Sequence, residues 1–222
     1  MKAKLLPLLC LLTAPGPAAA QGAPDGYHCT AELFTNIGAI YGVGYGEVQL
    51  SADPQYRATG ASYSYRIKDP VTGLGRMSAT WQLPGGKFAA PAIDSIWLPF
   101  HRELPKMPAS VEVSLDEGPP VSIAITDPAN IQVGDHGLAN GVTLLARDGT
   151  APELRGRRSF GFTMKAADGT VLFQDLFLLP PWKKVPGAVA SGLRRARSDL
   201  AKKKCDGFYR VGQRRTAAGL KP

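Results

Sequence analysis

The feature of this sequence that most restricts its fold is an alternation of apolar and polar residues that recurs between residues 46 and 180. Tyr63, Tyr65 and Ile67 would share one face of a strand, with two serines and an arginine on the other. A period of two residues matches extended strands, and helices do not produce it repeatedly. The same pattern recurs at residues 77–83, 111–115, 121–125 and 160–164.

Turn-forming residues stand where these runs stop, which predicts antiparallel hairpins. Asp168-Gly169 is expected to form a tight turn with two positive φ angles. The run that follows, Val171–Leu179, is apolar on both faces except for Gln174 and Asp175, which predicts a central strand covered on both sides. The body is therefore expected to be mainly β, as an antiparallel sandwich or a strongly curved sheet.

The pattern changes after Pro180. Pro186 suits the first turn of a helix, and the residues that follow at helical spacing are Val189, Leu193, Ala196 and Leu200. This predicts an amphipathic helix over residues 186–204 that packs on the sheet. The chain then divides into residues 1–20, a β-rich body at 21–180, a connector and basic helix at 181–209, and a flexible basic tail at 210–222.

The first twenty residues have the layout of a secretory signal peptide. Lys2 and Lys4 precede an apolar stretch, and small residues end at Ala20, where cleavage is expected. The apolar stretch is too short to span about 30 Å of hydrocarbon. The sequence thus predicts an exported protein, in the periplasm or outside the cell, with no transmembrane segment in the mature chain.

Cleavage would remove Cys10 and leave Cys29 and Cys205. An even pair in an exported chain predicts a disulfide, which would hold the two ends of the domain side by side. The alternative is two separate buried thiols.

Charge is divided unevenly along the chain. Residues 21–180 hold 12 basic and 16 acidic residues, whereas residues 181–222 hold 12 basic and only 2 acidic. The candidate binding residues in and after the helix are Arg194, Arg195, Arg197, Lys202, Lys203, Lys204 and Arg210. They would attract an anionic envelope component or an acidic protein surface through forces that weaken with salt. The alternative is a solvated helix face; nucleic acid is disfavoured because few aromatic residues accompany the charge.

Chemical motifs are scarce. The sequence contains no nucleophile elbow, zinc-binding pair or phosphate loop. Asp135 and His136 lie between two glycines and are weak candidates for a general base or a metal ligand, although a polar turn explains the same residues. A glycine-rich segment at residues 36–46 lacks the third glycine of a dinucleotide fingerprint, so it indicates bulges or a close approach of another group. No cofactor or metal is predicted.

The preferred interpretation is an exported, non-enzymatic, envelope-associated binding protein that uses its basic helix. The alternative is an exported hydrolase with a site near Asp135 and His136. A third possibility is a structural subunit whose strand near Leu176 pairs with another chain.

Overall fold

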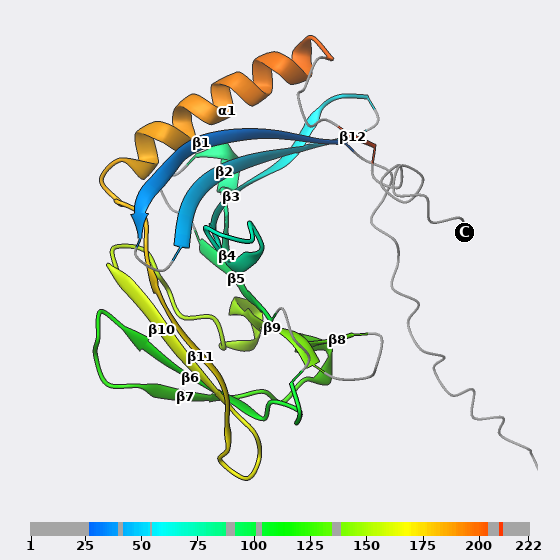
Figure 1. Cartoon of the computed structure of the whole chain (residues 1–222). Coiled ribbons are helices and arrows are strands. Elements are labelled where there is room, and N and C mark those ends of the chain that lie inside the picture. Colours follow the sequence, from blue (N-terminus) through cyan, green and yellow to red (C-terminus); the bar gives the residue numbers. More distant parts are fainter. Residues whose placement is uncertain are drawn as a thin grey trace, which may run out of the picture.

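The computed structural model describes residues 27–39, 42–53, 55–87, 92–100, 104–134, 139–203 and 209–210. These residues form two antiparallel sheets and a long helix (Figure 1). The eight-stranded sheet has the order β12 (Tyr209–Arg210), β1 (Tyr27–Ala39), β2 (Gly42–Ala52), β3 (Ala58–Lys68), β4 (Gly75–Gln82), β5 (Ala92–Pro99), β9 (Ala139–Leu145) and β8 (Ile131–Val133). The four-stranded sheet has the order β11 (Val171–Leu178), β10 (Ser159–Lys165), β6 (Ser110–Leu115) and β7 (Val121–Ala124).

The prediction of a mainly β, antiparallel, sandwich-like fold with one C-terminal helix is confirmed. The alternating runs form strands, and the hairpins β3–β4, β6–β7 and β10–β11 all pair in antiparallel fashion. The predicted turn geometry is wrong at Asp168-Gly169, where only the glycine has a positive φ, of 82°. Two consecutive positive φ angles occur instead at Asp116 and Glu117, with values of 53° and 61°.

The prediction that residues 171–179 form a central strand covered on both sides is also wrong. β11 lies at the edge of the smaller sheet, and among the described strands it pairs only with β10. Phe173 and Phe177 face the core, whereas Leu176 and Leu178 are 39% and 41% exposed. The run has no clean alternation because a bulge makes Leu172 an extra residue and turns it inward.

The core is built on one face of the eight-stranded sheet. Tyr63 of β3 pairs with Trp81 of β4, and both side chains are completely buried. Tyr65 is buried on the same face, and its hydroxyl donates to the carbonyl of Leu178 at 3.4 Å, which joins the two sheets. The tyrosine ring lies directly on Gly44 of β2, where a Cβ would collide with it. This part of the glycine-rich segment therefore accommodates the chain's own aromatic core.

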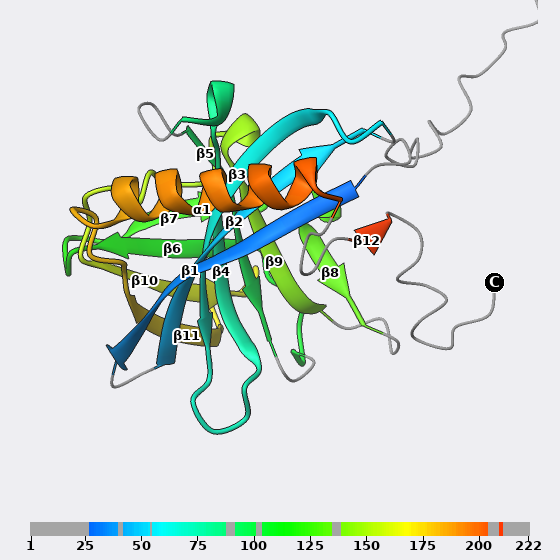
Figure 2. The same ribbon diagram turned by 90° about the horizontal axis from the view of Figure 1, so that it is seen from above.

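α1 (Val185–Ala201) begins one residue before the predicted start and ends three residues before the predicted end. It lies over β1 and β2 and runs opposite to β1 (Figures 1 and 2). The four residues predicted to face the sheet, Val189, Leu193, Ala196 and Leu200, are at most 5% exposed. Trp182, just before the helix, packs its ring edge-on against Trp81 at 5.3 Å. The apolar face of the helix is thus used entirely for packing.

A partly buried ion pair links β4 to β11. A register shift makes Arg76 the extra residue of a bulge in β4, and such bulges turn a side chain toward the other face. The Arg76 guanidinium binds both oxygens of Asp175, with Nε at 3.1 Å from Oδ2. Asp175 stands between Phe173 and Phe177 on the inner face of β11 and borders a cavity that Asp69 and Thr72 also line, so the pair satisfies a partly buried carboxylate.

Four aspartates hold turns by accepting hydrogen bonds, and these bonds lower the pKa of each carboxyl. The main partner is the Arg57 amide for Asp53, the Thr72 amide for Asp69 and the Arg158 amide for Asp116. For Asp168 it is the Lys106 ammonium group, whose Nζ lies 2.6 Å from Oδ2. These carboxylates are therefore favoured in the charged form by the folded chain.

We expect acid to destabilise the protein through these turns. A pKa lowered on folding contributes stability above the unfolded value, about 3.9 for aspartate, and this contribution disappears as pH falls through the folded pKa. The thermal midpoint should therefore decrease when the pH is lowered below about 4. Circular dichroism between pH 7 and pH 2 measures this change. Asp168→Asn should weaken this acid dependence; an unchanged pH profile in that variant would contradict the assignment.

Pairing between β12 and β1 places Tyr209 opposite His28, next to Cys29. Cys205 lies outside the described residues, so its disulfide with Cys29 stays a prediction. In the described part of the chain, no helix is long and apolar enough to cross a bilayer.

Candidate anion-binding surface

The exposed side of α1 is basic. Arg194, Arg195 and Arg197 are exposed, as are Lys202 and Lys203 immediately after the helix. The helix contains one acidic residue, Asp199, whose Oδ2 lies 3.7 Å from Nε of Arg195. We call these five basic residues the basic surface. Of the other predicted binding residues, Lys204 and the side chain of Arg210 lie outside the described part of the structure.

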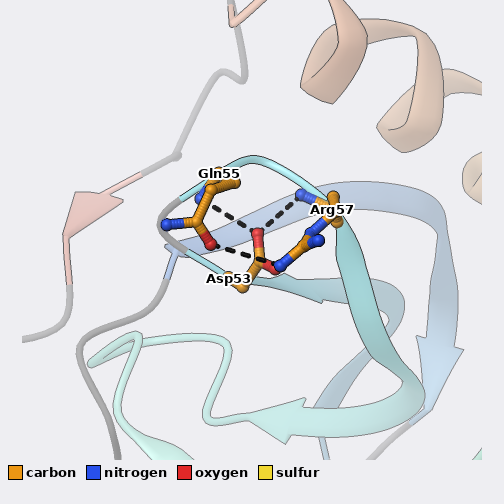
Figure 3. A network of polar contacts seen from close by, with 3 residues as sticks. All are labelled: Asp53, Gln55 and Arg57. Atoms are coloured by element: carbon orange, nitrogen blue, oxygen red, sulfur yellow. Dashed lines mark hydrogen bonds and ion pairs between the residues drawn. The ribbon is translucent and has the colours of Figure 1, made fainter.

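The end of the helix is attached to the β2–β3 turn. Lys203 has a positive φ of 53° and places its Nζ 4.8 Å from the centre of the Tyr56 ring. The turn itself is held by Asp53, whose Oδ1 accepts from the amides of Gln55 and Arg57 at 2.9 Å (Figure 3). The Arg57 side chain closes the network at 2.7 Å from Oδ2 of Asp53. Packing and this turn therefore fix where the basic surface lies on the body.

Arg197 occupies a special place on this surface. Its guanidinium lies against Gly86, so closely that a Cβ at that position would collide with it. Gly86 and Gly85 belong to the short 3-10 turn η1 (Pro84–Gly86) and have positive φ angles of 66° and 62°. Beside the guanidinium is a cavity of about 220 Å³, lined by Leu50, Ala58, Thr59, Gly60, Ala61, Leu83, Gly85, Gly86 and Arg197.

A larger cavity of about 540 Å³ lies between β11 and the β3–β4 turn. Its charged groups already have partners within the chain. Arg76 and Asp175 bind each other, and the Asp69 carboxylate accepts from the amides of Val71 and Thr72. The cavity beside Arg197 differs, because no described carboxylate lies within ion-pair distance of that guanidinium.

The alternative site lies outside the described part of the structure. Asp135 and His136 lie outside the described residues, as do His101 and the side chain of His28. In the described ranges, no group of three His, Cys, Asp or Glu residues is arranged to hold a metal ion.

Sequence reasoning identified Arg197 but missed the groups that surround it. Pro84-Gly85-Gly86 is recognisable as a turn, yet nothing local indicates that the turn reaches a helix more than 100 residues later. Thr59 carries no motif at all. Only the folded arrangement brings these groups together.

No known protein family, curated protein or solved structure matches this chain. Its function must therefore be argued from its own surface and cavities.

Proposed function

We propose that this protein is an exported binding protein that holds an anionic component of the cell envelope against the basic surface of α1. The observation that carries the proposal is the division of roles within the helix. Its apolar residues are buried against the sheet, and its arginines remain exposed. A helix that inserts into a membrane needs exposed apolar anchors, so contact through charge fits this helix better than insertion.

The charge distribution supports the same conclusion. The body at residues 21–180 carries 12 basic and 16 acidic residues, so its net charge is negative. Positive charge is concentrated on one helix and the residues that follow it. A polyanion would be repelled weakly by the body and attracted to the helix, which gives the encounter a preferred orientation.

We expect the triple variant Lys202→Glu, Lys203→Glu and Lys204→Glu to remain folded and to bind anionic material at least about tenfold more weakly at low salt. Binding is measured by co-sedimentation with lipopolysaccharide, peptidoglycan or anionic vesicles at low and moderate salt. The wild-type interaction should also weaken as salt rises, because counterions screen exposed charges.

The matched control reverses three exposed arginines outside the helix, Arg147, Arg155 and Arg158, and changes the net charge by the same amount. A neutral variant with glutamine at the three lysine positions shows whether binding is lost because positive charge is removed or because the introduced glutamates damage the end of the helix. If the control variant loses as much binding as the lysine variant, net charge and not the basic surface governs the interaction. Absence of wild-type binding to every anionic preparation at low salt overturns the proposal.

A further inference from the structure

We infer that the cavity beside Arg197 is a binding site for a phosphate group. The inference rests on the proposed function and names the chemical group that the basic surface holds most specifically. It comes from the way β3, the turn η1 and α1 meet.

The cavity exists because β4 ends at Gln82, opposite Ser62, and does not extend alongside the first residues of β3. The Leu83 amide donates to the Ala61 carbonyl at 2.9 Å, which closes the ladder between these strands. If β4 continued, residue 85 would pair with Thr59; instead η1 leads the chain away. On its other side, Thr59 is the extra residue of a bulge between β2 and β3. In the described register, Thr59 is therefore paired with no residue of β2 or β4.

Hydrogen-bond donors of several kinds meet at this cavity. Arg197 provides a guanidinium, which binds phosphate through two parallel hydrogen bonds. Thr59 is part of the lining and carries a hydroxyl group, and Gly85 brings its backbone to the wall without a side chain. Because these groups come from three segments of the chain, they suit an anion whose oxygens point in several directions. A phosphate has this shape, whereas the two oxygens of a carboxylate lie in one plane.

The remaining surroundings favour an anion. Among the described residues that line the cavity, none is acidic. Leu50 and Leu83 in its wall are at most 3% exposed, and an apolar wall strengthens charge interactions beside it. Its volume of about 220 Å³ is below the about 300–1,000 Å³ of pockets for drug-sized ligands. The cavity therefore fits one small charged group, with the rest of the partner lying on the exposed helix.

The test is a titration of the purified protein, followed by the amide NMR signals of Thr59 and Gly85. The probes are inorganic phosphate, glycerol 3-phosphate and sodium acetate at constant ionic strength. We expect the phosphates to shift both signals saturably, and acetate to have at least about tenfold lower affinity. Vesicles containing phosphatidic acid then show whether a lipid headgroup reaches the same site.

Arg197→Gln should weaken phosphate binding at least about tenfold, because the bidentate hydrogen bonds are lost. Arg194→Gln is the matched control, since Arg194 is exposed on the same helix and does not line the cavity. Arg197→Lys keeps the charge and should bind with intermediate affinity.

The outcomes separate this inference from the proposed function. No saturable shift with phosphate, equal shifts with acetate, or equal effects of Arg197→Gln and Arg194→Gln overturn the phosphate site. If polyanions still co-sediment in that case, the basic surface acts through charge alone. Saturable phosphate binding without polyanion binding supports the phosphate site and overturns the proposed function.

Discussion

Trp81→Ala is expected to lower the free energy of unfolding by about 3–5 kcal/mol, because it removes a large aromatic side chain from the centre of the core. The ring is completely buried, stacks on Tyr63 at 5.4 Å and meets Trp182 at 5.3 Å. Its Nε1 also donates to Glu153 at 3.1 Å. Trp182 directly precedes α1, so the substitution should loosen the helix as well as the sheet.

Urea unfolding followed by circular dichroism measures this effect, with the slope compared between variants. The control is Trp97→Ala, because Trp97 lies on the opposite face of the same sheet and is 38% exposed. Its loss should cost about 1 kcal/mol or less. If the two substitutions cost the same, Trp81 is not the centre of the core. Trp81→Phe should cost less than the alanine variant, since most of the ring packing remains.

Breaking the ion pair between Arg76 and Asp175 from one side is expected to have the second largest effect. Arg76→Met removes the guanidinium from the Asp175 carboxylate, which lies between Phe173 and Phe177, at a cost of about 2–3 kcal/mol. The adjacent cavity admits water, so the cost should lie below that of a fully enclosed charge. Urea unfolding at neutral pH measures it.

The double variant Arg76→Met and Asp175→Leu should recover most of this loss, because it replaces both charges by apolar groups of similar size. The double-mutant cycle gives the coupling between the two residues directly. A double variant that is no more stable than Arg76→Met would show that the pair does more than neutralise a buried charge. Asp168→Asn, at an exposed ion pair, should cost much less.

The sequence predicts the individual strands and the helix well because their patterns involve residues that are close together in the chain. Alternation at Tyr63, Tyr65 and Ile67 shows which side chains share a face, and all three are buried. The spacing from Val189 to Leu200 likewise identifies the packed side of the helix. These patterns depend on residues a few positions apart, so they can be recognised without knowing which strands are neighbours.

The place of a strand in its sheet depends on distant partners, and there the prediction fails. Apolar residues on both faces of β11 suggested a central strand, but the strand order places it at an edge. Bulges are equally hard to foresee: one turns Leu172 inward, and another turns Arg76 toward Asp175, 99 positions away. The cavity at Arg197 needs three separate segments, so only the basic residue in it could be recognised beforehand.

The packing of α1 on β1 and β2 has a consequence for how the chain reaches its native state. The helix is synthesised after β1 to β11, and it covers β1 and β2, which are synthesised before the other nine of these strands. Until α1 is made, these two strands lack its cover, and incompletely covered strands are prone to aggregation. The part of the fold around β1 and β2 can be completed only after α1 has left the ribosome.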